Sequence, residues 1–130
     1  MKKFLLIILI TISTTVNSLP VKYFNVLDYG AVNDGKTLNT EAIQTAIDAS
    51  SRAGNGTVYF PAGKYLSGTL FLKNDVTIFL DKNTVLLGST NLADYPECIP
   101  EYRSYTDNYT IRSLIYAEKK KNITITGKGT

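Results

Sequence analysis

Residues 56–88 read GTVYFPAGKYLSGTLFLKNDVTIFLDKNTVLLG. The stretch alternates short apolar segments with small groups of turn-forming residues such as glycine, proline, asparagine and aspartate. The apolar segments are rich in valine, isoleucine, threonine, tyrosine and phenylalanine, which suit a pleated and half-buried surface. Each segment is therefore predicted to be a short β-strand: 57–60, 65–66, 69–72, 76–80 and 84–87.

These strands can form an antiparallel meander or a coil in which each turn stacks on the one before. The turns at 73–75 and 81–83 lack the Asn-Gly and Asp-Gly pairs of tight hairpins, which favours the coil. The sequence KNDVTI at 73–78 also returns as KKNITI at 120–125, with Ile123 placed 47 residues after Val76. That spacing fits two coils, or one coil with a loop inserted at 91–113. A repeated turn-strand unit predicts a solenoid.

On the N-terminal side of this stretch, a first strand is predicted at 23–27, followed by a turn-rich segment at 28–36. A helix is predicted from Thr40 to Ala53, with Asn39 or Thr40 as its N-cap and Gly54 just past its end. Four small or medium side chains recur at helical spacing and form one narrow face: Ile43, Ala46, Ile47 and Ser50. We expect this helix to cover the exposed end of the first coil.

The first eighteen residues have the layout of a secretory signal peptide. Lys2 and Lys3 precede an apolar run, and a polar stretch ends at Ser18, after which cleavage is expected. The run is shorter than the roughly 20 apolar residues of a membrane-spanning helix. Residues 19–130 are thus expected to form the folded domain. Removal of both lysines lowers the formal net charge of +3 by two, so the charge favours no nucleic-acid partner.

Cys98 is the single cysteine, and the sequence contains no histidine. The thiol is expected to be either free and buried or half of a bridge to a partner outside this sequence. The absence of histidine excludes histidine-activated nucleophiles and histidine-ligated metal sites within these residues.

Several segments carry a family resemblance. Four of them resemble the opening of the pectate-lyase-like β-helix proteins: 24–31, 33–37, 39–47 and 56–65. Five more are similar to glycoside hydrolase family 28, the polygalacturonases: 75–80, 85–89, 92–96, 114–117 and 122–130. Together these segments span nearly all of residues 23–130. The first group of segments indicates the fold, and the second group narrows the choice of reaction among proteins with that fold.

The resemblance implies a mainly β fold, namely the N-terminal coils of a right-handed parallel β-helix with an N-terminal capping α-helix. It also implies inverting hydrolysis of α-1,4-galacturonan by a pair of carboxyl groups. The catalytic motifs of that family are Asn-Thr-Asp, Asp-Asp, Gly-His-Gly and Arg-Ile-Lys, and this sequence contains none of them. No catalytic residue, metal ligand or cofactor is therefore assigned to this chain, and the motifs are expected beyond Thr130.

The loop from Asp94 to Arg112 is the best candidate for substrate contact. Its aromatic side chains can stack on sugar rings and its arginine can pair with a galacturonate carboxylate. The residues are Tyr95, Tyr102, Arg103 and Tyr105, with Tyr109 as a further aromatic. The alternative is that this tyrosine-rich loop packs on its own scaffold. Two other groups are expected to serve only as local turn or surface residues: the acids Asp28, Asp34 and Asp48, and the basic run 119–121.

Three functions remain open at this point. The first is a pectin-degrading hydrolase, secreted or retained in the periplasm or at the cell surface, with pectic galacturonan as its substrate. The second is a non-catalytic polysaccharide-binding β-helix of the adhesin or tailspike kind. The third is a rhamnogalacturonase, lyase or epimerase on the same scaffold. We expect no nucleic-acid partner, no membrane association after signal cleavage, and a monomer at full length. Residues 19–130 alone are expected to be poorly soluble and inactive.

Overall fold

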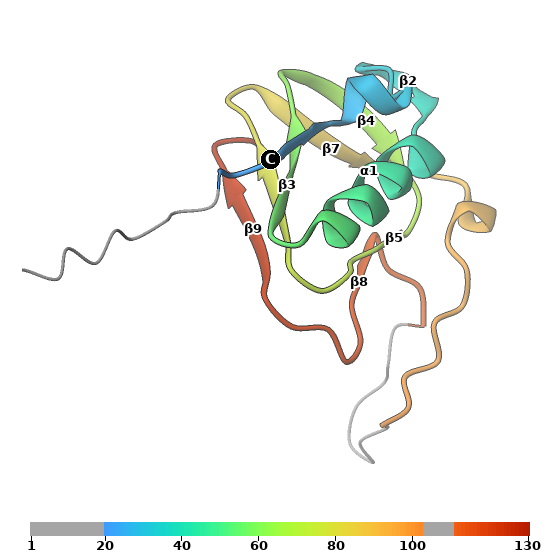
Figure 1. Cartoon of the computed structure of the whole chain (residues 1–130). Helices are drawn as coiled ribbons and strands as arrows, with labels where there is room; N and C mark the ends of the chain where they lie inside the picture. Colours follow the sequence, from blue (N-terminus) through green and yellow to red (C-terminus); the bar gives the residue numbers. More distant parts are fainter. Residues whose placement is uncertain (1–19, 103–110) are drawn as a thin grey trace, which may run out of the picture.

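The computed structural model describes residues 20–102 and 111–130. The chain forms many short strands, one long helix and two short 3-10 helices (Figure 1). In chain order the elements are β1 (Tyr23–Asn25), η1 (Val26–Tyr29), β2 (Asp34–Leu38), α1 (Thr40–Ala53), β3 (Gly56–Phe60), β4 (Gly63–Ser67), β5 (Leu70–Phe71), β6 (Val76–Leu80), β7 (Thr84–Gly88), η2 (Leu92–Asp94), β8 (Ile115–Tyr116) and β9 (Ile123–Gly127).

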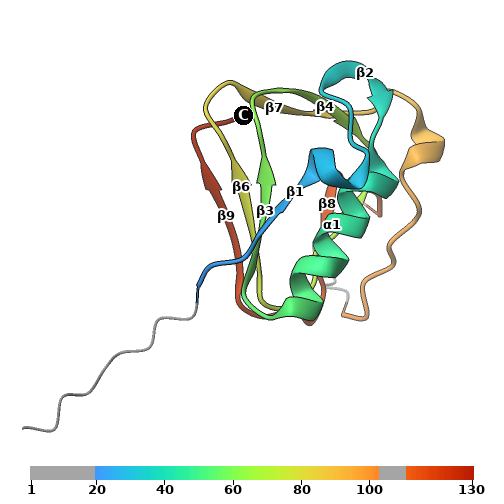
Figure 2. The same ribbon diagram turned by 45° about the horizontal axis from the view of Figure 1, so that its top comes forward.

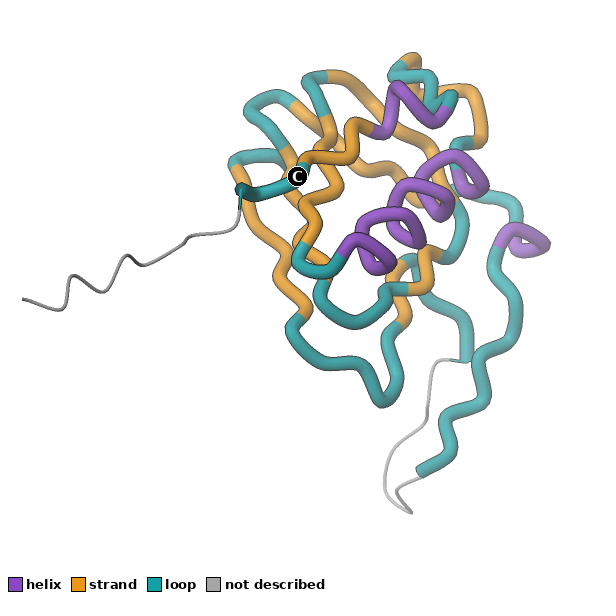
Figure 3. The backbone as a smooth tube through the Cα atoms, viewed as in Figure 1, coloured by secondary structure: helices purple, strands orange, loops and turns teal. Residues whose placement is uncertain are grey.

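The strands form three parallel sheets, which make up three sides of a coil. Sheet A has the order β1-β3-β6-β9, sheet B has β2-β4-β7 and sheet C has β5-β8. Figure 2 shows the strands of sheet A side by side, and Figure 3 shows the chain winding from strand through corner to strand. Every pairing in these sheets is parallel, which excludes the antiparallel meander and confirms the parallel coil.

The strand register explains the internal repeat. In sheet A, Val58 pairs with Ile78, twenty residues later, which is the length of a simple coil. Val76 pairs directly with Ile123, although 47 residues separate them. The repeat therefore marks one coil with an inserted segment, and the two-coil interpretation is wrong. The insertion lies between β7 and β8.

Each corner that leads into sheet A from β3 onward has a residue with positive φ. These residues are Asn55 (54°), Asp75 (58°) and Asn122 (56°), and they immediately precede β3, β6 and β9. Asparagine and aspartate enter this left-handed region more readily than other side chains. The Asn122 amide also donates to the Asp75 carboxylate at 2.7 Å, which links adjacent coils. The repeated KND and KKN motifs thus encode the same sharp corner in successive coils.

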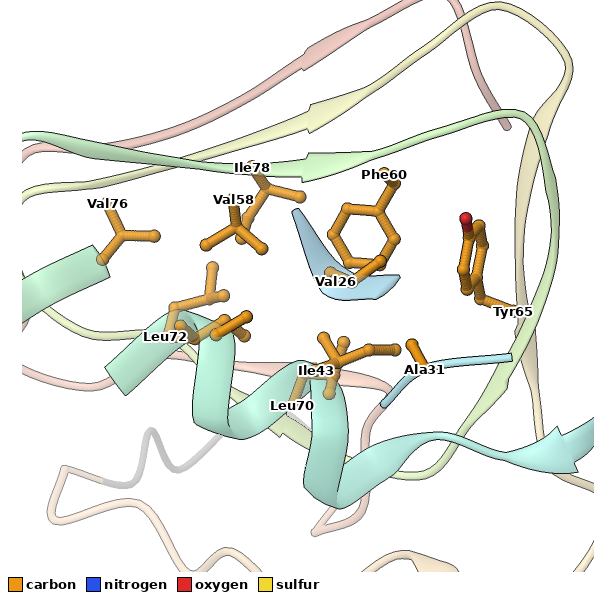
Figure 4. Close-up of a cluster of buried hydrophobic side chains, with 12 residues drawn as sticks. Val26, Ala31, Ile43, Val58, Phe60, Tyr65, Leu70, Leu72, Val76 and Ile78 are labelled. Carbon is orange, nitrogen blue, oxygen red and sulfur yellow. The ribbon is translucent and has the colours of Figure 1, made fainter. Parts of the chain in front are cut away.

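The core fills the interior of the coil (Figure 4). Alternate side chains of β3 and β6 point inward and are buried: Val58, Phe60, Val76 and Ile78. The rings of Phe60 and Tyr65 meet edge to face, with centroids 5.4 Å apart. The side chains between these buried residues point outward and stack from coil to coil. The rings of Tyr59 and Phe79 are stacked, with centroids 6.0 Å apart. Stacking in register therefore stabilises the coil on both faces of sheet A.

Helix α1 has the predicted bounds, and its predicted inner face is fully buried: Ile43, Ala46, Ile47 and Ser50. The helix occupies the third side of the first coil, beside β5. Polar side chains of α1 bond to the backbone on either side of β5: the Thr40 hydroxyl accepts from the Gly68 N–H at 2.8 Å, and the Ser51 hydroxyl donates to the Asn74 carbonyl at 2.9 Å. The helix therefore seals the edge of sheet C that β5 would otherwise expose.

Two local predictions near the N-terminus are corrected. The first strand ends at Asn25 and not at Leu27, because the Asn25 side chain accepts from the Leu27 N–H and starts a 3-10 turn that Gly30 closes. Residues 34–38, part of which was assigned to a turn, form β2. Asn39 does hold the N-cap position, yet its side chain makes no capping bond. Its amide instead bonds to both backbone groups of Val32, which fastens the preceding loop.

Candidate functional site

The inserted segment between β7 and β8, residues 89–114, is here called the arm. Figure 1 shows its two described limbs leaving the coil, with residues 103–110 between them outside the described part of the chain. At its base, the Thr69 N–H donates to the Asp94 carbonyl at 3.2 Å. A Cβ on Gly68 would lie 2.1 Å from that same oxygen, so only glycine permits the contact. The first limb is therefore packed closely against the corner between sheets B and C.

Tyr95 packs on the scaffold. Its hydroxyl donates to the carbonyl of Ser89 at 2.8 Å, and its side chain is half-buried. The Ser89 hydroxyl in turn bonds to the Asp94 carboxylate, and the Asn91 side chain accepts from the Ala93 N–H at 3.1 Å to begin η2. These contacts hold Tyr95 at the base of the arm, with its side chain partly accessible.

Arg112 joins the two limbs. Its Nη1 donates to the carbonyls of Leu92 (3.3 Å) and Tyr95 (2.5 Å), and its Nη2 pairs with Glu97 at 2.8 Å. The Cys98 N–H also donates across the limbs, to the Ile111 carbonyl at 2.6 Å. The planar guanidinium suits this role because it presents several donors in fixed directions. Sequence reasoning bounded the loop at Arg112 but did not identify this role.

The end of the first limb presents Tyr102, which is 82% exposed. Next to it, the Glu101 N–H donates to the Glu118 carboxylate at 2.8 Å, and Lys119 pairs with the Glu101 side chain. Tyr102 is thus held at the surface by a backbone bond of its neighbour. Arg103 and Tyr105, the other two predicted contact residues, lie outside the described residues, as does Tyr109.

The outward face of sheet C lies beside the arm and was not recognised from the sequence. Phe71 and Tyr116 pair across β5 and β8, and their rings meet at 68° with centroids 5.8 Å apart. The Tyr116 hydroxyl donates to Glu118 at 2.8 Å, which raises the pKa of the phenol. The bond from Glu101 N–H, followed by that from Tyr116, lowers the pKa of the Glu118 carboxyl, so Glu118 is an ionised acceptor. Strand alternation around the buried Leu70 and Leu72 was the signal that could have found Phe71.

The acidic residues with assigned bonds have local structural roles. Asp34 accepts from the N–H groups of Lys36 and Thr37 at 2.8 Å each, which lowers its pKa from 3.8 to about 2. Asp48 accepts from the Gln44 amide at 3.0 Å. Residues 20–102 and 111–130 contain no group of three acidic or cysteine side chains that could hold a metal ion.

Two further sequence expectations concern Cys98 and the basic run 119–121. Cys98 is buried and unpaired, with its sulfur 3.6 Å from the Pro96 carbonyl. Lys119, Lys120 and Lys121 are exposed, as expected for a solvated run. In the part of the chain that the structure describes, no helix combines the length and apolarity needed to cross a membrane. The signal-peptide prediction concerns residues 1–18, which lie outside the described residues.

Known proteins resemble this chain over most of its length. An exo-poly-alpha-D-galacturonosidase from Dickeya chrysanthemi is 44% identical over 127 residues, which cover 92% of this chain and 20% of the relative. The family 28 exopolygalacturonase of Yersinia enterocolitica has the same fold with a TM-score of 0.72 and 43% identity, covering 85% of this chain and 20% of that one. A hyperthermoactive exopolygalacturonase from Thermotoga maritima gives a TM-score of 0.74 at 28% identity, covering 86% and 25%.

The chain thus spans about a fifth to a quarter of the length of these relatives. The resemblance to family 28 that the sequence carried is confirmed by these matches, and so is the right-handed parallel β-helix. Residues 23–130, from the first strand to the last residue, match one family description in full. On this evidence the chain belongs to the rhamnogalacturonase A/epimerase, pectate lyase-like family.

Proposed function

We propose that this chain is the N-terminal part of a secreted, pectin-degrading glycoside hydrolase that cleaves α-1,4-galacturonan with inversion. The observation that carries the proposal is the 44% identity to an exo-poly-alpha-D-galacturonosidase over 92% of the chain. The family match at residues 23–130 includes the arm as well as the coils. The alternatives share the coil but predict other outcomes: a polysaccharide-binding module forms no product, and a rhamnogalacturonase, lyase or epimerase forms a different one.

The coils and the arm have a positioning role in this proposal. Parallel strands hold side chains of adjacent coils about 4.8 Å apart along the coil axis. Inverting hydrolysis needs an acid and a base separated by roughly 6.5–9.5 Å, so that water fits between the base and the sugar. A stiff coil can keep such a separation constant. We place the two catalytic carboxyl groups in coils that follow Thr130, and substrate contacts at Tyr95, Tyr102, Arg103 and Tyr105.

The location of the protein is part of the proposal. The Lys2-Lys3 pair, the apolar run and the polar stretch before Ser18 support export, followed by removal of residues 1–18. The mature protein would then meet pectin outside the cytoplasm or at the cell surface. We propose that it acts there as a monomer.

The test compares two proteins: this chain from residue 19, and the product of the reading frame extended past Thr130 to its stop codon. Both are incubated with polygalacturonate, and reducing ends are measured together with the anomeric form of the first product by NMR. We expect hydrolysis with inversion by the longer protein only. Unsaturated, ultraviolet-absorbing products would indicate a lyase, and binding without new reducing ends would indicate a binding module. Turnover by the short chain would contradict the placement of the catalytic residues.

A further inference from the structure

A shallow hollow lies where α1 meets the turn that follows β5. Its volume is about 310 Å³, and it is lined by Asp48, Ser51 and Arg52 from the helix and by Lys73 from the turn. Ligand pockets in proteins have volumes of about 300–1,000 Å³. The hollow is therefore large enough to receive a small polar group, and it opens to solvent.

The hollow carries a positive charge that the described residues do not neutralise. Two of its lining side chains are already engaged, because Asp48 accepts from the Gln44 amide at 3.0 Å and the Ser51 hydroxyl donates to the Asn74 carbonyl at 2.9 Å. The two ion pairs among the described residues involve neither Arg52 nor Lys73. With two cations and one carboxylate, the lining has a net charge of +1 and two free cationic groups.

The hollow adjoins an aromatic surface. Leu70 and Leu72 are buried in the core, so Phe71 between them points outward from sheet C. Gln44 connects the two places, because its Nε2 donates both to the Asp48 carboxylate of the hollow and to the Phe71 carbonyl, at 3.0 Å each. Cationic groups beside an aromatic surface match a sugar acid, which combines a carboxylate with an apolar ring face.

We propose that this hollow binds a uronic acid unit of the polysaccharide, with Arg52 and Lys73 holding its carboxylate and Phe71 contacting its ring. The choice of a polyuronate as ligand rests on the proposed function, and the inference adds a binding site to it. Arginine provides the paired donors that a carboxylate accepts, and lysine adds a second charge. Since both side chains reach solvent, the interaction should weaken as salt concentration rises.

The experiment uses the full chain, isotope-labelled and fused to a soluble carrier protein because the chain alone is expected to be poorly soluble, and NMR titration with trigalacturonate. Amide and side-chain shifts are expected to move at Arg52 and Lys73 and at the Phe71 ring. The uncharged oligomer made by methyl-esterification of trigalacturonate should shift these signals far less. A variant carrying Arg52→Gln and Lys73→Gln should bind trigalacturonate about tenfold more weakly, as expected when charge-assisted hydrogen bonds are lost.

The matched control carries Lys36→Gln and Lys82→Gln. These exposed lysines are not part of the hollow, and the change in net charge is the same. The control should bind as the unmodified chain does. Equal weakening of both double variants, equal binding of the methyl ester, or no shift at Arg52 and Lys73 in the unmodified chain would each overturn the proposal. If the double variant fails to fold, the chemical-shift changes of Arg52, Lys73 and Phe71 in the unmodified chain still test the proposal.

The result of the binding experiment is independent of the result of the hydrolysis experiment. If the extended protein leaves polygalacturonate intact while trigalacturonate still binds through Arg52 and Lys73, the proposed hydrolase function fails and the uronate site stands. If the extended protein hydrolyses polygalacturonate but the hollow shows no shifts, the hydrolase stands and the site is refuted.

Discussion

The side-chain amide of Gln44 hydrogen-bonds both main-chain groups of Phe71: Nε2 donates to the carbonyl at 3.0 Å, and Oε1 accepts from the N–H at 2.9 Å. A neighbouring β-strand would use the same donor and acceptor. On the opposite edge of β5, Leu70 and Leu72 donate to Leu114 and Tyr116. Gln44 therefore stands in for a strand at the end of sheet C, and Asp48 orients its amide.

Gln44→Ala should expose this edge. We expect amide hydrogen exchange at Phe71 to become fast, because its N–H loses its acceptor, while exchange at Leu72 stays slow. The free energy of unfolding should fall by about 1–3 kcal/mol, as expected when buried or half-buried backbone groups lose their partners. Exchange is followed by NMR and unfolding by urea titration.

Thr45→Ala is the matched control for Gln44→Ala. Its hydroxyl bonds only to the Glu41 carbonyl within α1 and lies on the exposed side. Slow amide exchange at Phe71 in Gln44→Ala would show that Gln44 does not take the place of a neighbouring strand.

Asp75→Val should destabilise the coil. Asp75 has φ of 58°, and a β-branched side chain is strained in this region by about 1–2 kcal/mol. The bond from Asn122 is lost as well. Asp75→Asn keeps a side chain that tolerates the left-handed region and should cost much less. Thermal and urea unfolding measure both changes, and equal effects of the two substitutions would show that backbone strain is not the cause.

Arg112→Met should separate the limbs of the arm while leaving the coil intact. The substitution removes the bonds to Leu92, Tyr95 and Glu97. We expect faster proteolysis between residues 96 and 102, measured by mass spectrometry, with little change in the exchange of sheet A amides. Lys64→Met on the exposed side of β4 serves as the control and should leave the cleavage rate unchanged. A cleavage rate equal to that of the unmodified chain would show that Arg112 does not hold the limbs together.

Asp34 predicts a pH dependence of stability. Its folded-state pKa of about 2 lies below its ordinary value of 3.8, because backbone N–H groups of Lys36 and Thr37 bond to the ionised form. The stabilisation is thus complete above about pH 4 and is lost as the pH falls through 2. Asp34→Asn should flatten the stability curve between pH 4 and 2. The check is urea unfolding at each pH, and an unchanged slope in Asp34→Asn would exclude this carboxyl as its source.

Helix α1 and the repeated corners before β6 and β9 could be predicted from the chain because their signals are local. The helix is defined by apolar side chains three and four residues apart, which lie on one side whatever the surroundings. The corners are defined by asparagine and aspartate, whose tolerance of positive φ is intrinsic. Both signals lie within a few residues of sequence, so they can be recognised before the fold is known.

Other features depend on residues that are distant along the chain. Gln44 and Phe71 are 27 residues apart, and the Phe71–Tyr116 pair exists only because the arm loops out and returns β8 to β5. The local sequence likewise could not distinguish two coils from one coil with an insertion, since both keep the 47-residue spacing; strand pairing of Val76 with Ile123 resolves it. The amino-acid sequence alone predicted the helix, the strands from β3 to β7 and, through the repeated corner motif, the parallel coil, since backbone preferences and side-chain periodicity act over short range. The path of the arm, the sealed edge of β5 and the surface of sheet C arose from folding, since hydrogen bonds and ring contacts form only between groups that the folded chain brings together.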